Sequence, residues 1–272
     1  MRHRKLGPED RKAFRRAVYA HARRDLPWRK NVSPYRVVVS EIMLQQTRAD
    51  RVAQKYPGFI RAFPSFAALA GASTAQVLAA WQGLGYNRRA LMLHRCAREV
   101  RDKYRGRLPR DPEILRLLPG IGPATAASIT AFAFDAPAVF IETNIRTVFI
   151  HHFFPRSKAV PDARIAPLVE QTLDRASPSR WYNALMDYGA ALKRTHGNPS
   201  RRSAHHVRQK PFEGSDRHVR GRILQYALQG GPVTVARGAR ALSVKPARLR
   251  RILEALAREG FLQKTRDGYR VT

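Results

Sequence analysis

One stretch, LPGIGPATAASIT at residues 118–130, limits the local fold more than any other part of the chain. Its two glycines allow a tight turn and a close backbone approach, and Pro123 suits the first position of a helix because no amide partner is needed there. The first amides of that helix have no acceptors within the helix and lie at the positive end of its dipole. The pattern predicts a backbone socket for one phosphate, which does not read base sequence.

The charge of the chain indicates which molecule carries that phosphate. There are 51 Lys and Arg against 20 Asp and Glu, a net charge of +31, and the arginines occur from end to end. A field of this size attracts polyanions, with nucleic acid as the first candidate and an anionic membrane as the second. The single cysteine, Cys96, excludes a disulfide framework, and the charged N-terminus lacks the apolar core of a secretory signal.

The longest uncharged run, residues 117–134, approaches the length of a membrane span. Its prolines and glycines gather at one end, which favours a turn followed by a buried helix. We therefore expect a protein of the cytoplasm that associates with the nucleoid and does not enter a membrane.

Helical patterns cover most of the chain. An amphipathic pattern spans residues 8–24, and Ser33 with Pro34 is a start signal for the next helix. Ser73 is expected to cap a helix, and Asp111 caps another that has Pro112 at its first position. Short helices joined by Gly/Pro turns predict a mainly α-helical bundle.

A polar, basic segment without periodicity, residues 194–215, separates the C-terminal part. The chain then predicts three helices and a β-hairpin turning at Asp267-Gly268, which is the element order of a winged helix. Pro246–Glu259 would be the recognition-type helix, with Arg248 and Arg251 contacting DNA. The alternative is a winged helix used for protein contact or packing.

Five motifs in order carry a resemblance to a known family. They are LPWR at 26–29, SEIMLQQT at 40–47, WQGLGYNRRALMLH at 81–94, LPGIGPATA at 118–126 and MDYGA at 186–190. Residues 25 to about 192 resemble the helix-hairpin-helix base-excision DNA glycosylases, and are most similar to the adenine DNA glycosylase branch.

The resemblance implies a two-lobed α-helical glycosylase domain with a cleft between its lobes. That domain would span residues 1–193. One lobe would contain about 33–130, and the other the N-terminal segment with 131–193. Residues 194–215 would form a basic linker, and 216–272 the winged-helix-like domain. The expected partner is double-stranded DNA with a mispaired or damaged base, bound by a monomer, and no protein partner is assigned.

Breaking an N-glycosidic bond requires an acid for the leaving base and a negative charge beneath an oxocarbenium-like sugar. Glu41 matches the family glutamate that protonates the departing purine, if burial among Ile42, Met43 and Trp28 raises its pKa. The alternative for Glu41 is a surface pair with an arginine.

Glu142 stands where these enzymes usually carry aspartate. The extra methylene moves the carboxylate by about 1.5 Å, a scale on which catalysis can fail. We expect Glu142 to stabilise the cation and orient water, with Asp187 as the substitute candidate, although MDYGA is usually a packing element.

Two further departures concern the type of reaction and the cofactor. Ala124 occupies the slot in which bifunctional relatives carry a nucleophilic lysine, so no Schiff base can form there. Where many relatives place four iron–sulfur cysteines, this chain has Lys193, Ser200, Ser203 and Gln209. We expect no iron–sulfur cluster and no other metal site, with a monovalent cation at the hairpin as the only option.

The remaining candidate residues would contact DNA. Leu44, Gln45 and Gln46 would reach the space left by the flipped base and Tyr86 would stack beside it, unless Leu44 and Tyr86 are core residues. Phosphate contacts are expected from Arg88, Arg89 and Arg146. The hairpin and nearby contacts are assigned to Gly120, Gly122, Thr125 and Asn144.

The function expected from the sequence is a monofunctional DNA glycosylase of base excision repair. It would flip a base, adenine first, and hydrolyse its N-glycosidic bond to leave an abasic site without efficient lyase activity. The alternatives are a glycosylase for uracil, thymine or another altered base, and a catalytically inactive DNA-binding protein.

Overall fold

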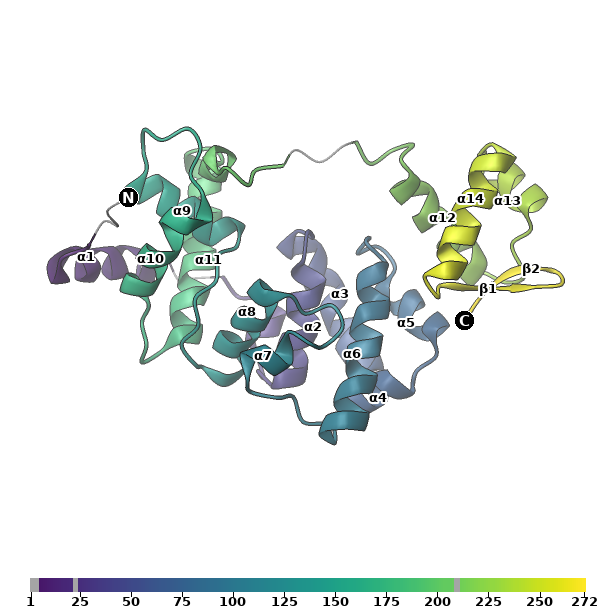
Figure 1. Ribbon diagram of the computed structural model, residues 1–272, viewed down its shortest axis with the longest axis horizontal. Helices are drawn as coiled ribbons and strands as arrows, with labels where there is room; N and C mark the ends of the chain where they lie inside the picture. The colour runs from purple at the N-terminus through teal and green to yellow at the C-terminus, as the bar shows by residue number, and fades with distance from the viewer. Residues whose placement is uncertain (1–4, 22–23, 208–210) are drawn as a thin grey trace. The chain divides into compact units, whose positions relative to one another are not determined.

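The computed structural model describes residues 5–21, 24–207 and 211–272. The described chain is mainly helical, with one two-stranded sheet near its C-terminus (Figure 1). This confirms the predicted mainly α-helical class. The backbone divides into two compact units. Unit 1 contains Met1–Glu41 and Pro109–Arg208, and unit 2 contains Ile42–Leu108 and Gln209–Thr272.

Unit 1 is built from helices that begin at sequence signals. Its elements are α1 (Pro8–Tyr19), η1 (Pro27–Arg29), most of α2 (Pro34–Leu44), α7 (Pro112–Leu115), α8 (Pro123–Phe134), α9 (Thr143–Phe153), α10 (Asp162–Thr172), α11 (Pro178–Thr195) and η2 (Pro199–Arg202). Helices α1, α7, α8 and α11 each begin at a proline, whose missing amide costs nothing in the first turn. As predicted, Asp111 caps α7 by accepting a bond from the Glu113 amide.

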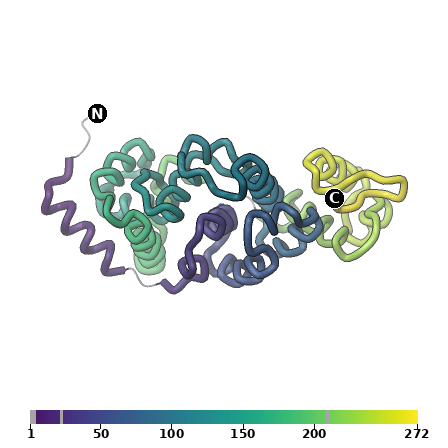
Figure 2. Tube along the Cα trace, turned by 90° about the horizontal axis from the view of Figure 1, so that it is seen from below, coloured from purple at the N-terminus to yellow at the C-terminus, as the bar shows by residue number. Residues whose placement is uncertain are grey.

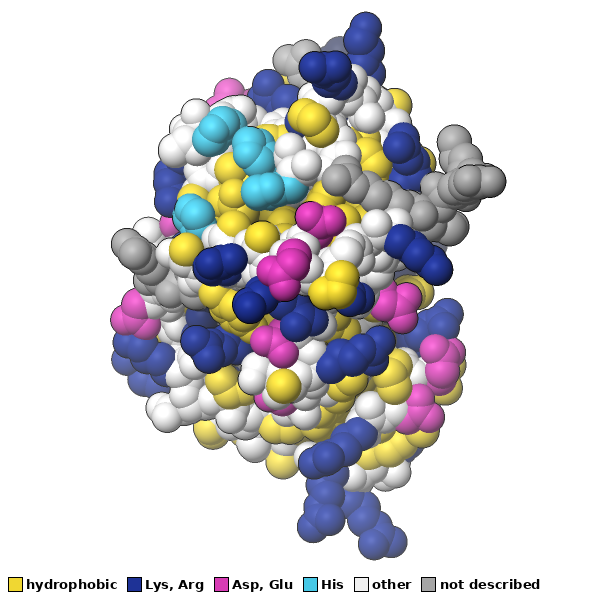
Figure 3. All heavy atoms as spheres, turned by 90° about the vertical axis from the view of Figure 1, so that its left-hand side faces the viewer, with side chains coloured by type: hydrophobic (Ala, Val, Ile, Leu, Met, Phe, Trp, Pro, Cys, Tyr) yellow, Lys and Arg dark blue, Asp and Glu magenta, His cyan; other side chains and the backbone are white. Residues whose placement is uncertain are grey.

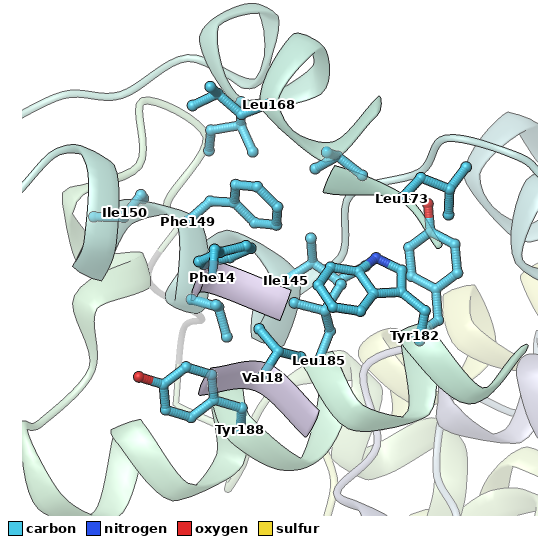
Figure 4. Packing of buried hydrophobic residues seen from close by; sticks show 14 of the residues in the cluster. Phe14, Val18, Ile145, Phe149, Ile150, Leu168, Leu173, Tyr182, Leu185 and Tyr188 are labelled. Atoms are coloured by element: carbon cyan, nitrogen blue, oxygen red, sulfur yellow. The ribbon is translucent and has the colours of Figure 1, made fainter. Parts of the chain in front are cut away.

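The core of unit 1 lies where α1, α9, α10 and α11 meet. Phe14 of α1 packs against Phe149 of α9 with ring centroids 5.3 Å apart, and against Trp181 of α11 at 6.1 Å (Figure 4). Phe14 and Val18 are buried together with the inward side chains of α9 and α11. The N-terminal helix therefore seals the core that holds α9 in place.

The segment after α11 packs onto α9 instead of forming a free linker. Val160 and Ser203 form a parallel bridge, and Arg202 donates to the carbonyls of Phe154 and Pro155. Ser200 is buried and bonded to Asn198. The part of the expected linker up to residue 207 thus belongs to unit 1.

Unit 2 combines the helices of residues 42–108 with the C-terminal elements. These are α3 (Ala49–Ala62), α4 (Phe66–Gly71), α5 (Thr74–Trp81), α6 (Arg88–Tyr104), α12 (Asp216–Leu228), α13 (Val235–Leu242), α14 (Pro246–Arg258), β1 (Leu262–Thr265) and β2 (Gly268–Val271). Ser73 caps α5 as predicted, in a capping box with Gln76.

The C-terminal elements end in an antiparallel hairpin, drawn in yellow in Figure 2. Its turn is Arg266–Asp267, one residue earlier than predicted, because Gly268 already pairs with Thr265. Val233 exchanges backbone bonds with Tyr269, and a Cβ on Gly268 would lie 2.9 Å from the Val233 carbonyl oxygen. Three helices and a hairpin occur in the predicted order, and the winged-helix assignment remains a prediction.

The division into units differs from the lobes expected at residues 33 and 130. Residues 109–130 belong to unit 1 because α8 packs against α11. The C-terminal elements belong to unit 2 because α12 packs against α5, and the Ala75 amide donates to the Thr272 carbonyl at 3.1 Å. Among the described residues, no helix is both long and apolar enough to span a membrane.

Histidine side chains gather on one face of unit 1, where the His151 ring lies against those of His152 and His196 (Figure 3). His152 contacts His151 and bonds the Tyr188 hydroxyl at 2.7 Å. Burial, together with the charges of His151 and His21, lowers the pKa of His152 to about 4. Between pH 6.5 and 4 the unfolded chain therefore binds a proton that the folded chain resists.

We predict that acidification from pH 7 to pH 5 lowers the free energy of unfolding by about 1–2 kcal/mol through His152. His152→Phe, which keeps a ring against Phe14, should lose most of this dependence. Replacing the exposed His206 with glutamine is the control and should keep it. Urea unfolding at both pH values measures the effect, and equal dependence in His152→Phe would contradict it.

Candidate active site

Glu142 is the N-cap of α9. Its Oε1 accepts bonds from the Asn144 amide at 2.6 Å and the Ile145 amide at 3.0 Å. The carboxylate thus lies at the positive end of the helix dipole. The extra methylene relative to aspartate does not prevent capping. Burial raises the pKa of Glu142 above its ordinary value, while Lys193, the two amides and Arg146 act to lower it.

The first turn of α9 lies directly on α11. A Cβ on Gly189 would overlap the backbone carbonyl of Asn144 and would lie 2.6 Å from the Asn144 Cβ, so only glycine permits this approach. From the next turn of α11, Lys193 Nζ donates to Asn144 Oδ1 at 2.7 Å. Burial lowers the pKa of Lys193, and the charge of Glu142 acts to raise it. The MDYGA helix therefore fixes the residue whose amide holds Glu142.

Glu41 lies on α2 and accepts a hydrogen bond from the Ser128 hydroxyl of α8 at 2.5 Å. Burial, with a smaller contribution from the charge of Glu142, raises the pKa of Glu41 to about 7, although the Ser128 bond acts to lower it. Glu41 is thus the kind of carboxyl group that holds a proton near neutral pH, and Glu142 is close enough to interact with it electrostatically. No arginine bond to the Glu41 side chain is present among the described residues.

Ser128 was not predicted as a site residue, although its spacing from Ala124 could have indicated it. It follows Ala124 by four residues, so the two share a face of α8. The slot of the missing lysine therefore lies one helical turn from the group that bonds Glu41. Ala124 itself is exposed.

The hairpin before α8 has the predicted geometry. Gly120 adopts a left-handed conformation at φ +81°, and Pro123 is the first helical residue after Gly122. No side chain caps the helix at Gly122. The exposed first turn, beside the half-buried Thr125, leaves backbone amides directed out of the helix, as a phosphate socket requires.

Asp187 is not arranged as a substitute catalytic group. It is buried and bonds Arg29 Nη2 at 2.8 Å and Arg24 Nε at 2.5 Å. Burial acts to raise the pKa of Asp187, but the bonds from Arg29 and Arg24 outweigh it and hold the pKa below its usual range. This ion pair joins LPWR to MDYGA, because unpaired charges would be costly there. Asp187 also borders an open hollow of about 620 Å³ lined by Arg24, Arg29 and Arg180.

In unit 2, Arg89 has a structural role that replaces its predicted phosphate contact. Its Nη1 donates to the carbonyls of Ile42 and Met43 at 2.9 and 2.8 Å, and Nη2 donates to the Thr47 hydroxyl and the Gly85 carbonyl. The guanidinium therefore bonds the end of α2 and the turn before α6. Arg88 is exposed and remains a candidate phosphate contact.

The two segments joined by Arg89 contain the residues expected to open a duplex. Gln46 is exposed, and Gln46 and Tyr86 both have positive φ angles, +54° and +47°. Leu44, Gln45 and Tyr86 are half-buried, so none of them is a fully buried core residue.

Four other residues that were predicted to contact DNA bond protein side chains: Arg146, Asn144, Arg248 and Arg251. Arg146 forms a two-bond pair with Asp162, and the Asn144 side chain is held by Lys193. Both residues thus have internal roles, and their predicted DNA contacts remain predictions. Arg248 and Arg251 both bond Asp216, so phosphate would have to compete with this carboxylate.

The four slots of the family cluster contain no cysteine. Lys193 bonds Asn144, while Ser200 and Ser203 are buried in the segment packed on α9. Gln209 lies outside the described residues. Within the described chain, no group of three or more His, Cys, Asp or Glu could hold a metal.

We predict that Gly189→Ala lowers the free energy of unfolding by about 2–4 kcal/mol, because the added methyl group meets the backbone of Asn144. Gly58→Ala in the exposed face of α3 is the matched control and should be neutral or slightly stabilising. Urea unfolding measures both, and a Gly189→Ala protein as stable as wild type would contradict the close approach.

The family described as HhH-GPD superfamily base excision DNA repair protein matches residues 39–178. An adenine DNA glycosylase of Mycolicibacterium smegmatis is 36% identical over 271 residues, which covers 92% of each chain. That of Homo sapiens is 35% identical over 196 residues, which covers 66% of this chain and 36% of the human protein.

Solved structures give the same fold. A thermostable thymine-DNA glycosylase has a TM-score of 0.58 and 26% identity, covering 66% of this chain and 86% of that one. An endonuclease III in a non-covalent DNA complex has a TM-score of 0.54 and 16% identity, covering 79% and 94%. The chain therefore belongs to the helix-hairpin-helix superfamily of base excision DNA repair glycosylases, in the branch of the adenine DNA glycosylases.

Proposed function

We propose that this protein is a monofunctional glycosylase that removes mispaired adenine from double-stranded DNA and leaves an abasic site. The observation that carries the proposal is the pair of carboxylates in unit 1. Burial lifts the pKa of Glu41 to about 7, and Glu142 is fixed on the amides of α9. The adenine DNA glycosylases to which the chain is similar support adenine as the target.

In the proposed reaction the adenine leaves the duplex before chemistry begins. Glu41 donates its proton to a ring nitrogen of the purine, and the bond between C1′ and the base breaks with its electron pair going to the base. The Glu142 carboxylate stabilises the positive charge on the sugar. Water then adds to C1′ and passes a proton to Glu142, so the products are free adenine and an abasic site.

The absence of strand cleavage is part of the proposal. A lyase step needs an amine that attacks C1′ and forms a Schiff base, and Ala124 has none. Lys193 carries an amine close to Glu142, but its Nζ is bonded to Asn144. We assign it the role of holding the negative charge of Glu142 in place.

A second candidate substrate comes from one comparison. The thymine-DNA glycosylase with 26% identity favours thymine as the second candidate target. The same experiment that tests adenine separates the two, because only the base in the duplex changes.

We predict that single-turnover base release is fastest from duplexes with adenine opposite guanine or 8-oxoguanine, and that strands break only after alkali. Glu41→Gln and Glu142→Gln should each lower the rate by about 10²–10⁴-fold while duplex binding survives. Glu170→Gln, an exposed glutamate on α10, is the control.

Faster release from thymine or uracil mispairs would overturn adenine specificity. Breaks without alkali would overturn the monofunctional assignment. Inactivity on every duplex would overturn the whole proposal.

The pKa of Glu41 gives a second prediction. The acid must carry its proton, so base release should fall as pH rises through about 7. The Ser128 bond favours the charged carboxylate, so Ser128→Ala should move this alkaline limb to higher pH by about one unit.

The control is Thr130→Ala, which removes a buried hydroxyl bonded to its own helix. It should leave the alkaline limb in place. Single-turnover rates from pH 6 to 10 measure the limb, and a shift to lower pH in Ser128→Ala would contradict Glu41 as the acid.

A further inference from the structure

The turn between α5 and α6 has a strained backbone. Gly83, Gly85 and Tyr86 all have positive φ, at +89°, +71° and +47°. Glycine adopts this region freely, but a bulky side chain such as tyrosine rarely does. Such strain persists only where surrounding contacts impose it, and it concentrates at functional sites. The contacts of Tyr86 therefore indicate why this residue is held in a strained conformation.

On one side Tyr86 is held by Arg89. The guanidinium lies 5.5 Å from the Tyr86 ring centroid and 5.3 Å from that of the buried Trp81. The same group bonds the carbonyls at the end of α2 and in the turn. One arginine thus fixes both segments proposed to enter the duplex.

On the other side Tyr86 is held by the C-terminal residues. Arg217 of α12 lies 5.1 Å from the Tyr86 ring centroid and donates from Nη1 to the Tyr86 hydroxyl at 2.6 Å. The Arg217 guanidinium carbon also lies 5.2 Å from the ring centroid of Phe212. Trp81, Arg89, Tyr86, Arg217 and Phe212 form an alternating arginine–aromatic stack that runs from the buried Trp81 to Phe212, which is 51% exposed.

Stability alone does not account for Arg217. The C-terminal elements already have other attachments to the rest of unit 2. Ala75 bonds Thr272, and Arg95 donates to the Glu259 carbonyl. A tyrosine with a positive φ, whose ring is held by Arg89 and whose hydroxyl is held by Arg217, indicates a contact kept for a functional reason.

We propose that Arg217 is a positioning residue for Tyr86, through which the C-terminal residues 211–272 take part in opening the duplex. Arg217 holds the Tyr86 ring in the orientation that stacks between bases beside the extruded nucleotide. Stacking of an aromatic ring on bases makes up for part of the lost base stacking. Residues 211–272 would then contribute to opening the duplex as well as positive charge. This inference rests on the proposed glycosylase activity and assigns one of its steps.

The test follows unstacking and base release separately in the full chain. A duplex carries 2-aminopurine beside the mispair, because its fluorescence rises when neighbouring bases unstack. Arg217→Ala is compared with Arg222→Ala, a matched loss of charge from the same helix whose guanidinium bonds Leu242 and not Tyr86. We expect Arg217→Ala to lower both the fluorescence rise and single-turnover base release by about tenfold. Arg222→Ala should match wild type.

Two further variants separate positioning from charge and from folding. Arg217→Lys keeps the charge but not the planar stacking group, so it should not restore the signal, whereas a phosphate contact would be restored. Tyr86→Ala combined with Arg217→Ala should be no worse than Tyr86→Ala alone, because both act through one ring. Thermal unfolding midpoints of Arg217→Ala and Arg222→Ala should agree within a few degrees.

Additive losses, rescue by lysine, or equal behaviour of Arg217→Ala and Arg222→Ala would each overturn the inference. If wild-type protein releases no base from any duplex, the proposed function fails. The 2-aminopurine comparison then still decides the role of Arg217, since it needs binding and not catalysis.

Discussion

The N-cap of α9 is the interaction on which the candidate site depends. One oxygen of Glu142 takes the Asn144 and Ile145 amides, so the residue that starts the helix is also the residue that supplies negative charge. The helix dipole and Lys193 favour the charged form, and burial opposes it. The cap holds because α9 lies against α11 at Gly189 and against α1 at Phe14. Local capping, helix packing and the proposed chemistry thus share one small group of atoms.

The second carboxylate differs from the first in its surroundings. Glu41 has one hydroxyl bond, from Ser128, while Glu142 has two amides and a nearby ammonium group. Burial raises the pKa of both, but only Glu142 has several groups that offset it. Two carboxyl groups placed in unequal environments can divide acid and electrostatic roles. The surroundings of Asp187 likewise decide its role, because its ion pairs with Arg24 and Arg29 hold the fold together.

Local signals in the sequence predicted the helix starts well. Prolines and caps at Pro123, Ser73 and Asp111 act within one turn, so they are legible without tertiary structure. The Ser128 contact and the pairing of Arg146 with Asp162 were not predicted, because they depend on which helices pack together. Arginine roles were the weakest predictions: composition shows that positive charge is abundant, but only the fold shows that Arg89 is used internally. The unit boundaries depend in the same way on the packing of α8 and α12.

The central claim is that Glu142 faces the positive charge that develops on the sugar. Its most direct test is the ratio of affinities for two duplexes, one with a cationic pyrrolidine in place of the target nucleotide and one with neutral tetrahydrofuran. The wild-type protein should prefer the cation by at least about tenfold, and Glu142→Gln should lose that preference while it binds the neutral duplex unchanged. An unchanged preference in Glu142→Gln would contradict the account.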